Sequence, residues 1–213
     1  MHLILPGTAT FLLGLLLTLL VRRGALRLGV VAVPKVDRWH RRQVAMLGGV
    51  AMAGAILAGA VLAPVRDSGV WILLGGALTL GGVGLADDLA PLKPQTKLIA
   101  QILVAAAIAS FGLALNLTGY PLLNVLVTIF WIVGVTNALN LLDNMDGLAA
   151  GIASIAVGFR LVFFVMDGNV DGAIFAAIVL GAILGFLVFN FNPASIFMGD
   201  TGSLFLGVLV SGL

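Results

Sequence analysis

Residues 98–136 read LIAQILVAAAIASFGLALNLTGYPLLNVLVTIFWIVGVT, a run of 39 residues without a charged side chain. As one continuous α-helix this run would be about 58 Å long, roughly twice the ~30 Å hydrocarbon thickness of a bilayer. The run must therefore fold back on itself, and residues 116–121 contain the Asn, Gly and Pro expected at a turn. We predict two membrane-spanning helices joined by that turn.

The composition of the whole chain agrees with a membrane protein. The 213 residues are 61% hydrophobic and only 9% charged, whereas a soluble domain carries about 25% charged residues. There is no Cys and only two His, which excludes disulfides, thiolate metal sites and imidazole metal cages, so any metal must be a hard, oxygen-bound ion. The formal net charge of +2 is too small to suggest nucleic acid binding.

Further apolar runs of spanning length predict an all-α, polytopic transmembrane bundle. We expect one membrane domain over residues 1–213, with seven complete spans and the start of an eighth near Ser203. Asn192-Pro193 should stop the seventh span. Besides the pair in 98–136, the expected spans are 3–21, 44–65, 68–86, 147–166 and 173–190.

Charge is distributed unevenly between the predicted loops. Nine of the eleven Lys and Arg residues lie in the loops after the first and third spans, up to Lys97. The positive-inside rule makes this side cytoplasmic, so we expect a multi-pass protein of the inner (cytoplasmic) membrane. Six of the nine Asp residues fall on the same side, which suggests a site there for a charged cytosolic substrate; they are Asp37, Asp87, Asp88, Asp143, Asp146 and Asp200.

The pair Asp87-Asp88 ends the third span and is followed by Lys97 and Gln101. Adjacent helical residues point about 100° apart, so the two carboxylates should have different partners. Two acids at a helix C-terminus oppose the helix dipole and need a compensating cation; the alternative is a solvated helix end. Lys97 and Gln101 share a helix face, where Lys97 either helps to cradle a phosphate or snorkels to the interface.

Polar residues recur every three positions after the fifth span. If the segment is helical, Asn140, Asp143 and Asp146 form one polar arc that follows Asn137, and these groups need a metal or a cation from another loop. A polar loop is the alternative. An EF-hand calcium loop is excluded because its ligand pattern and terminal Glu are absent.

Two further segments carry polar groups on the same side. In residues 199–203, Gly-Asp-Thr-Gly-Ser, a glycine-flanked turn could present the Asp200 carboxylate and several N–H groups to Mg²⁺ and phosphate, or be a plain turn. Residues 37–42 form a basic juxtamembrane loop, which is either a positive-inside signal or a clamp for an anionic headgroup.

Together these motifs resemble those of the polyprenyl-phosphate N-acetylhexosamine-1-phosphate transferases. The resemblance covers residues 34–207 and rests on three multi-residue segments: the Asp87-Asp88 pair with Lys97 and Gln101, residues 137–148, and residues 192–203. Within that group, residues 34–49, Asn192-Pro-Ala and residues 205–207 look more like the undecaprenyl-phosphate GlcNAc-1-phosphate branch than the MurNAc-pentapeptide branch.

The resemblance implies transfer of phospho-GlcNAc from a UDP-sugar to polyprenyl phosphate, with release of UMP, in cell-wall or surface polysaccharide synthesis. It implies Mg²⁺, with Mn²⁺ as a substitute, and leaves a homodimer open. By the same resemblance, Asp87 orients or deprotonates the lipid phosphate, and Asp88 with Lys97 holds the phosphate end. The remaining residues are implied as follows: Asp143 and Asp146 to orient Mg²⁺ or the nucleotide sugar, Asp200 and Asn140 to bind the metal, and Gln101, His40, Arg41 and Asn137 to bind substrate.

The chain departs from this pattern in two ways. Ala32 and Gln43 stand where relatives commonly have an acid and a proline, and Leu213 precedes the later loop whose histidine-rich motif helps to bind the nucleotide sugar. We therefore expect a C-terminally truncated member. Two alternatives stay open: an inactive remnant, and a cation-coupled transporter, whose binding groups should lie at the bilayer midplane.

Overall fold

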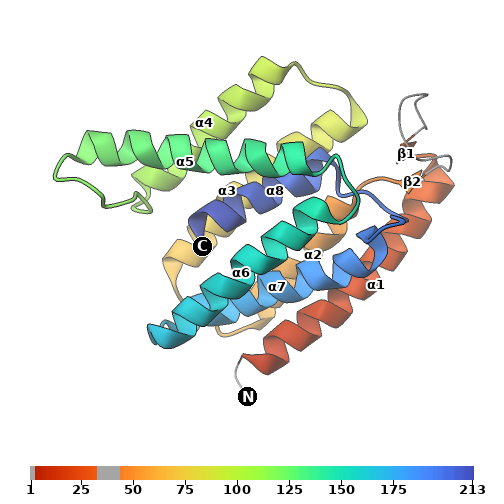
Figure 1. Ribbon diagram of the computed structural model, residues 1–213, viewed down its shortest axis with the longest axis horizontal. Helices are drawn as coiled ribbons and strands as arrows, with labels where there is room; N and C mark the ends of the chain where they lie inside the picture. The colour runs from red at the N-terminus through yellow and green to blue at the C-terminus, as the bar shows by residue number, and fades with distance from the viewer. Residues whose placement is uncertain (1–2, 33–43) are drawn as a thin grey trace.

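The structure, a computed structural model, describes residues 3–32 and 44–213. These residues form eight helices and one short antiparallel strand pair (Figure 1). The all-α prediction is therefore confirmed, apart from four strand residues. In chain order the elements are α1 (Ile4–Leu28), β1 (Val31–Ala32), β2 (Val44–Ala45), α2 (Gly48–Leu62), α3 (Ser68–Leu89), α4 (Pro94–Ser110), α5 (Pro121–Leu142), α6 (Leu148–Met166), α7 (Val170–Asn190) and α8 (Gly199–Gly212).

Five of the described helices, α1, α3, α5, α6 and α7, are long and apolar enough to cross a membrane. The chain is thus a multi-pass membrane protein. Helices α2 and α4 have 15 and 17 residues, or about 22 and 26 Å of helix, somewhat less than the hydrocarbon thickness. The number of complete spans, expected to be seven, stays a prediction.

Several helices extend beyond the apolar runs that predicted them. Helix α1 continues past residue 21 to Leu28, α3 includes Asp87-Asp88, and α5 continues to Leu142. The runs were ended at the first polar residues, but polar residues remain helical at the end of a span when water or another helix supplies partners. Conversely, residues 44–45 form β2 instead of starting α2, because they pair with β1 and lie beside Ile196.

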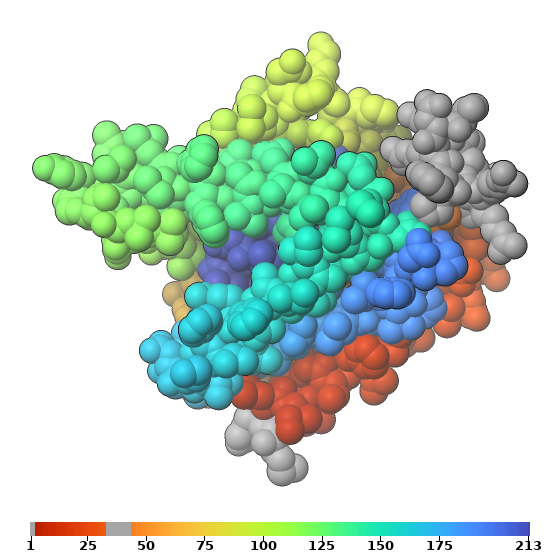
Figure 2. All heavy atoms as spheres, in the orientation of Figure 1, coloured from red at the N-terminus to blue at the C-terminus, as the bar shows by residue number. Residues whose placement is uncertain are grey.

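Helices α7 and α8 form the interior of the bundle. Every residue from Thr201 to Leu209 is buried, and α8 packs against α2, α3 and α5. Helix α7 packs against α1, α2 and α6, with Phe175 and Phe186 fully buried. The α4–α5 hairpin extends sideways from the bundle, and atoms of α8 are visible between α5 and α6 (Figures 1 and 2).

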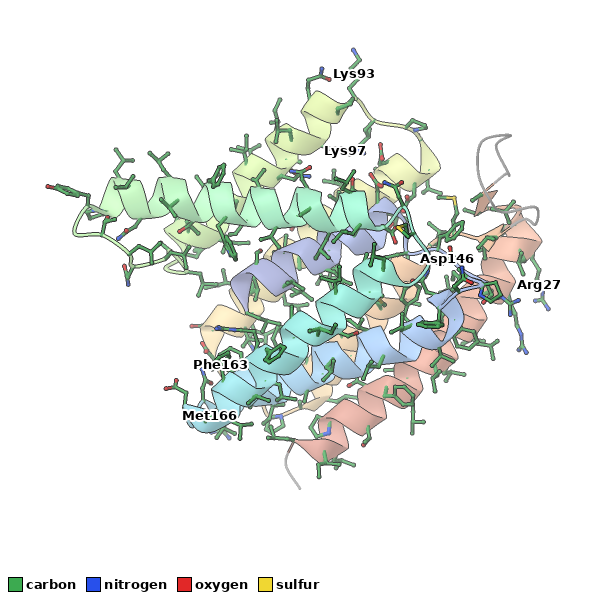
Figure 3. The ribbon with its side chains drawn as sticks, in the orientation of Figure 1. Arg27, Lys93, Lys97, Asp146, Phe163 and Met166 are labelled. Carbon is green, nitrogen blue, oxygen red and sulfur yellow. The ribbon has the colours of Figure 1, made fainter. Side chains whose placement is uncertain are left out.

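The loops that follow α1, α3, α5 and α7 meet at one end of the bundle. The N–H of Gly48 donates to the Phe197 carbonyl at 2.9 Å, and Ala45 bridges Ile196. In Figure 3, Arg27 and Asp146 lie at this end and Met166 lies at the other. The predicted convergence of these four loops is confirmed for the described residues.

The start of α8 lies very close to the end of α3. A Cβ on Gly84 would overlap the carbonyl group of Asp200 and come within 2.6 Å of the Thr201 nitrogen, whereas a Cβ on Gly82 would meet nothing within 4 Å. Small residues allow such close backbone approach between membrane helices. Gly84 therefore sets the α3–α8 distance at the end where the loops converge.

We expect Gly84→Ala to destabilise the protein by about 1–3 kcal/mol, the usual cost of overpacking, because backbone atoms of α8 would have to move. Gly82→Ala, two residues away on the same helix, should be neutral because a Cβ there meets nothing within 4 Å. Thermal unfolding of both variants in detergent, followed by the loss of monodisperse protein, measures the difference. Equal midpoints for the two variants would contradict the close approach.

Candidate active site

The ammonium group of Lys97 lies between two carboxylates from different helices. Its Nζ is 2.9 Å from Asp87 Oδ2 and 2.6 Å from Asp200 Oδ2. The Lys97 side chain is only 24% exposed, so water screens the two ion pairs incompletely. The compensating cation predicted for the end of α3 is therefore Lys97, and it also joins α3 to α8.

The local sequence explains how Lys97 is brought to Asp87. Pro94 begins α4 because its fixed φ suits the first helical position, and this puts Lys97 in the first turn. Asp87 also accepts a hydrogen bond from the Leu92 N–H at 2.6 Å. That bond folds the α3–α4 loop back over the end of α3 and so brings Lys97 toward Asp87.

Asn140, in the last turn of α5, binds the other oxygen of Asp200. Its Nδ2 donates to Asp200 Oδ1 at 3.0 Å and to Ser203 Oγ at 2.8 Å. Both Asp200 oxygens therefore have partners, one from α4 and one from α5. Ser203 was not among the predicted site residues. Its i, i+3 spacing from Asp200 could have indicated it, but only if α8 were known to start at Gly199, because this spacing places two side chains on one face only within a helix.

Asp88 points away from Asp87, as the 100° spacing predicts. Its carboxylate accepts from the Asp200 N–H at 2.9 Å, the Thr201 N–H at 3.0 Å and the Thr201 hydroxyl at 2.6 Å. Residues 199–203 are the first turn of α8 and not the expected glycine-flanked turn. Two of the N–H groups expected to meet phosphate are thus bound by Asp88.

Asp143 is the half-buried C-cap of α5 and lies near the start of α8. Its surroundings raise its pKa to about 8. Burial, which removes water from the carboxylate, is the largest cause; the charges of Asp200 and Asp88 also raise the pKa, and a hydrogen bond from the Gly199 N–H lowers it. Asp143 thus belongs to the same cluster of acidic groups as Asp200.

Asp146 joins the α5–α6 loop to the α7–α8 loop. It accepts from the Ala194 N–H at 3.0 Å and from Asn192 Nδ2 at 3.3 Å. Asn190 makes a second link, accepting from the Gly147 N–H at 3.2 Å and donating to the Ile196 carbonyl at 3.0 Å. The predicted single arc is therefore wrong for Asp146, because α5 ends at Leu142 and the chain turns before reaching it.

Gln101 and Asn137 bind each other across α4 and α5. Asn137 Nδ2 donates to Gln101 Oε1 at 2.7 Å, and Gln101 is only 2% exposed. The pair lies one turn beyond Lys97 and fixes α4 against α5. The structure thus places both residues beside the cluster but bonded to one another; His40 and Arg41 lie outside the described residues.

The oxygen groups of the cluster suit a hard divalent cation. Mg²⁺ commonly takes only one or two carboxylate ligands from a protein and the rest from substrate and water. Within residues 3–32 and 44–213, no three His, Asp or Glu residues form a ready-made metal cage. Asp200, with Asn140 beside it, is the donor set that fits such an ion, provided that the Asn140 amide turns its oxygen toward it.

We expect Lys97→Gln to destabilise the protein by about 1–2 kcal/mol, because Asp87 and Asp200 lose their shared cation and repel each other. Lys93→Gln, a matched change at the exposed N-cap position of α4, should have little effect. Thermal unfolding in detergent compares them. A second substitution, Asp87→Asn, should recover part of the loss in Lys97→Gln; purely additive effects would contradict the ion-pair assignment.

Comparison with known proteins shows which sequences this chain is similar to. Residues 70–213 match glycosyl transferase family 4. A probable undecaprenyl-phosphate N-acetylglucosaminyl 1-phosphate transferase of Bacillus subtilis (strain 168) is 35% identical over 207 residues, which is 92% of this chain and 58% of that protein.

Two further relatives carry related names. A phospho-N-acetylmuramoyl-pentapeptide-transferase of Geobacillus sp. (strain WCH70) is 42% identical over 157 residues, 64% of this chain and 48% of that protein. A decaprenyl-phosphate N-acetylglucosaminephosphotransferase of Mycobacterium leprae (strain TN) is 32% identical over 213 residues, 87% of this chain and 54% of that protein. The chain spans about half the length of these relatives. Because the family match covers more than half of the chain and includes α3, α4, α5 and α8, which build the Lys97 cluster, the chain belongs to glycosyl transferase family 4.

Proposed function

We propose that the chain is the phosphate-handling part of a polyprenyl-phosphate N-acetylhexosamine-1-phosphate transferase of cell-wall or surface polysaccharide synthesis. An oxygen of the lipid phosphate attacks the β-phosphorus of a UDP-sugar, the bond from that phosphorus to the bridging oxygen breaks, and UMP leaves. The names of the three relatives support this reaction class. We propose GlcNAc as the sugar because the match that covers 92% of the chain is to a GlcNAc-1-phosphate transferase.

One observation carries the proposal: Lys97, Asp87, Asp200 and Asn140 meet from four helices within hydrogen-bond distance. Joining one phosphate to another brings several negative charges together, and catalysis of such a transfer depends mainly on neutralising and positioning them. Lys97 supplies the positive charge, and its two carboxylate partners hold it at the water-facing end of the bundle. Asp87 would orient the lipid phosphate, whose second pKa near 6 leaves it mostly ionised at neutral pH without a strong base.

We propose that Asp200 and Asn140 hold Mg²⁺, for which Mn²⁺ can substitute. When bound, the ion supplies further neutralisation of the pyrophosphate charge. Asp143, close enough to Asp200 for their charges to interact, would help to orient the ion. Asp146, on the loops that face the solvent, would help to position the nucleotide sugar.

We also propose that this end faces the cytoplasm of the inner membrane. The excess of Lys and Arg on this side supports that orientation. The clustered groups lie at the ends of α3 and α5 and at the starts of α4 and α8. A transporter would instead place its binding groups near the bilayer midplane, so the placement favours a reaction at the membrane surface.

Asp200→Asn should lower sugar-phosphate transfer by about 100-fold or more, as expected for loss of a charged group at a phosphate-transfer site. The amide can still receive Lys97 on its oxygen, so the fold should remain. The assay measures UMP release from UDP-GlcNAc and polyprenyl phosphate with Mg²⁺, using the complete gene product with whatever follows Leu213. Asp167→Asn, at an exposed position on the opposite end, is the matched control.

Undiminished UMP release by Asp200→Asn would refute the assignment of that residue. Absence of UMP release from the unmodified gene product, with every UDP-sugar and lipid tested, would favour the inactive-remnant alternative.

The absence of Cys makes the orientation directly testable. Single variants Lys93→Cys and Asn144→Cys should resist a membrane-impermeant thiol reagent in intact cells and react after permeabilisation, since both positions are exposed at the proposed cytoplasmic end. Asp167→Cys should react in intact cells. The reverse pattern would show that the Lys97 cluster faces outward.

A further inference from the structure

We infer that Asp88 is a positioning residue: it caps α8 from another helix and thereby fixes where Asp200 lies. This inference deepens the proposed function and rests on it for its catalytic consequence. In this inference Asp88 positions Asp200 and does not hold the phosphate of the substrate. The inference rests on the contacts of the two Asp88 carboxylate oxygens.

Helix α8 has no capping side chain of its own. The first N–H groups of any helix lack partners within the helix, and Ser, Thr, Asp or Asn at the N-cap usually supplies one. The N-cap of α8 is Met198, which makes no side-chain cap. Asp88, 112 residues earlier in the chain, binds the N–H groups of Asp200 and Thr201 instead.

Gly199, which lies against the Asp88 carboxylate, is further evidence that this contact is specific. Gly199 has φ +74°, and a Cβ there would lie 2.6 Å from Asp88 Oδ2 and 2.9 Å from Oδ1. Any larger residue at 199 would therefore push the carboxylate off the helix end. Asp88 also receives the Thr201 hydroxyl at 2.6 Å, so both of its oxygens have partners before any substrate arrives.

Capping by Asp88 acts directly on the residue that carries the site carboxylate. The backbone N–H of Asp200 is held by Asp88, while its side chain reaches Lys97 and Asn140. The positive end of the helix dipole offsets the charge of Asp88. Loss of this cap would leave the N–H groups of Asp200 and Thr201 without Asp88 and let the Asp200 carboxylate move away from Lys97. A small displacement of this kind strongly lowers the rate of a reaction that depends on positioning.

Hydrogen exchange of the chain in detergent tests the cap without any substrate. Asp88→Ala should speed exchange of the Asp200 and Thr201 amides by about tenfold or more, the effect of losing a hydrogen bond of ordinary strength. Asp67→Ala is the matched control, because Asp67 caps α3 at the opposite end by accepting from the Gly69 N–H at 2.7 Å. It should speed exchange at Gly69 and leave the α8 amides unchanged. Unchanged exchange at Asp200 and Thr201 in Asp88→Ala would overturn the inference.

Turnover of the complete gene product then distinguishes a positioning role of Asp88 from direct participation of Asp88 in the reaction. Asn at position 88 keeps one acceptor oxygen, so Asp88→Asn should lie between the unmodified protein and Asp88→Ala both in amide protection and in kcat, with an unchanged shape of the pH profile. If Asp88→Asn keeps the α8 amides protected and yet turns over as slowly as Asp88→Ala, Asp88 itself reacts and the inference is wrong. If the unmodified protein has no transferase activity, the exchange result still decides whether Asp88 caps α8, and only the proposed function is lost.

Discussion

The Lys97 ammonium, shared by Asp87 and Asp200, is the interaction on which this end of the molecule depends. An unpaired carboxylate beside a membrane is costly, and two of them side by side would repel. Lys97 offsets the charge of both carboxylates, because its Nζ lies 2.9 Å from Asp87 and 2.6 Å from Asp200. The end of α3 and the starts of α4 and α8 are therefore fixed relative to one another by electrostatics as well as by packing.

The polar groups around this ion pair come from several helices and link different parts of the chain. Each one binds a partner from another part of the chain: Asp88 binds α8, Asn140 binds Asp200, Gln101 binds Asn137, and Asp146 binds the α7–α8 loop. In a bilayer the helices gain little from burying apolar surface against each other, so close packing and interhelical hydrogen bonds contribute much of the specificity. The groups that would handle substrate thus also determine the arrangement of the helix ends.

Much of this could be predicted from sequence, and the limits have physical causes. Apolar runs predicted the helices, and the alternation of loops predicted that Asp87, Asp143 and Asp200 would lie on the same side of the membrane. The turn assigned to Asp200 was wrong because Gly199 and Gly202 suggested a turn on both sides of the Asp, whereas only Gly199 has a positive φ and Gly202 is helical. The pairing of Gln101 with Asn137 and the cap from Asp88 depend on which helices are neighbours, and spacing along one chain does not specify that.

Under the proposed function, the geometry of Lys97 would let one cation serve both the resting protein and a phosphate substrate. An ammonium group has three N–H donors, and the two carboxylates receive one each. In the proposed reaction a phosphate oxygen would bind the third without displacing either carboxylate, so binding would not require the loss of an existing ion pair. The two carboxylates hold the ammonium group in place, and Asn140 and Asp88 keep Asp200 in place. The positive charge is therefore held in position in advance, which in the proposed transfer would reduce the reorganisation needed when negative charge develops.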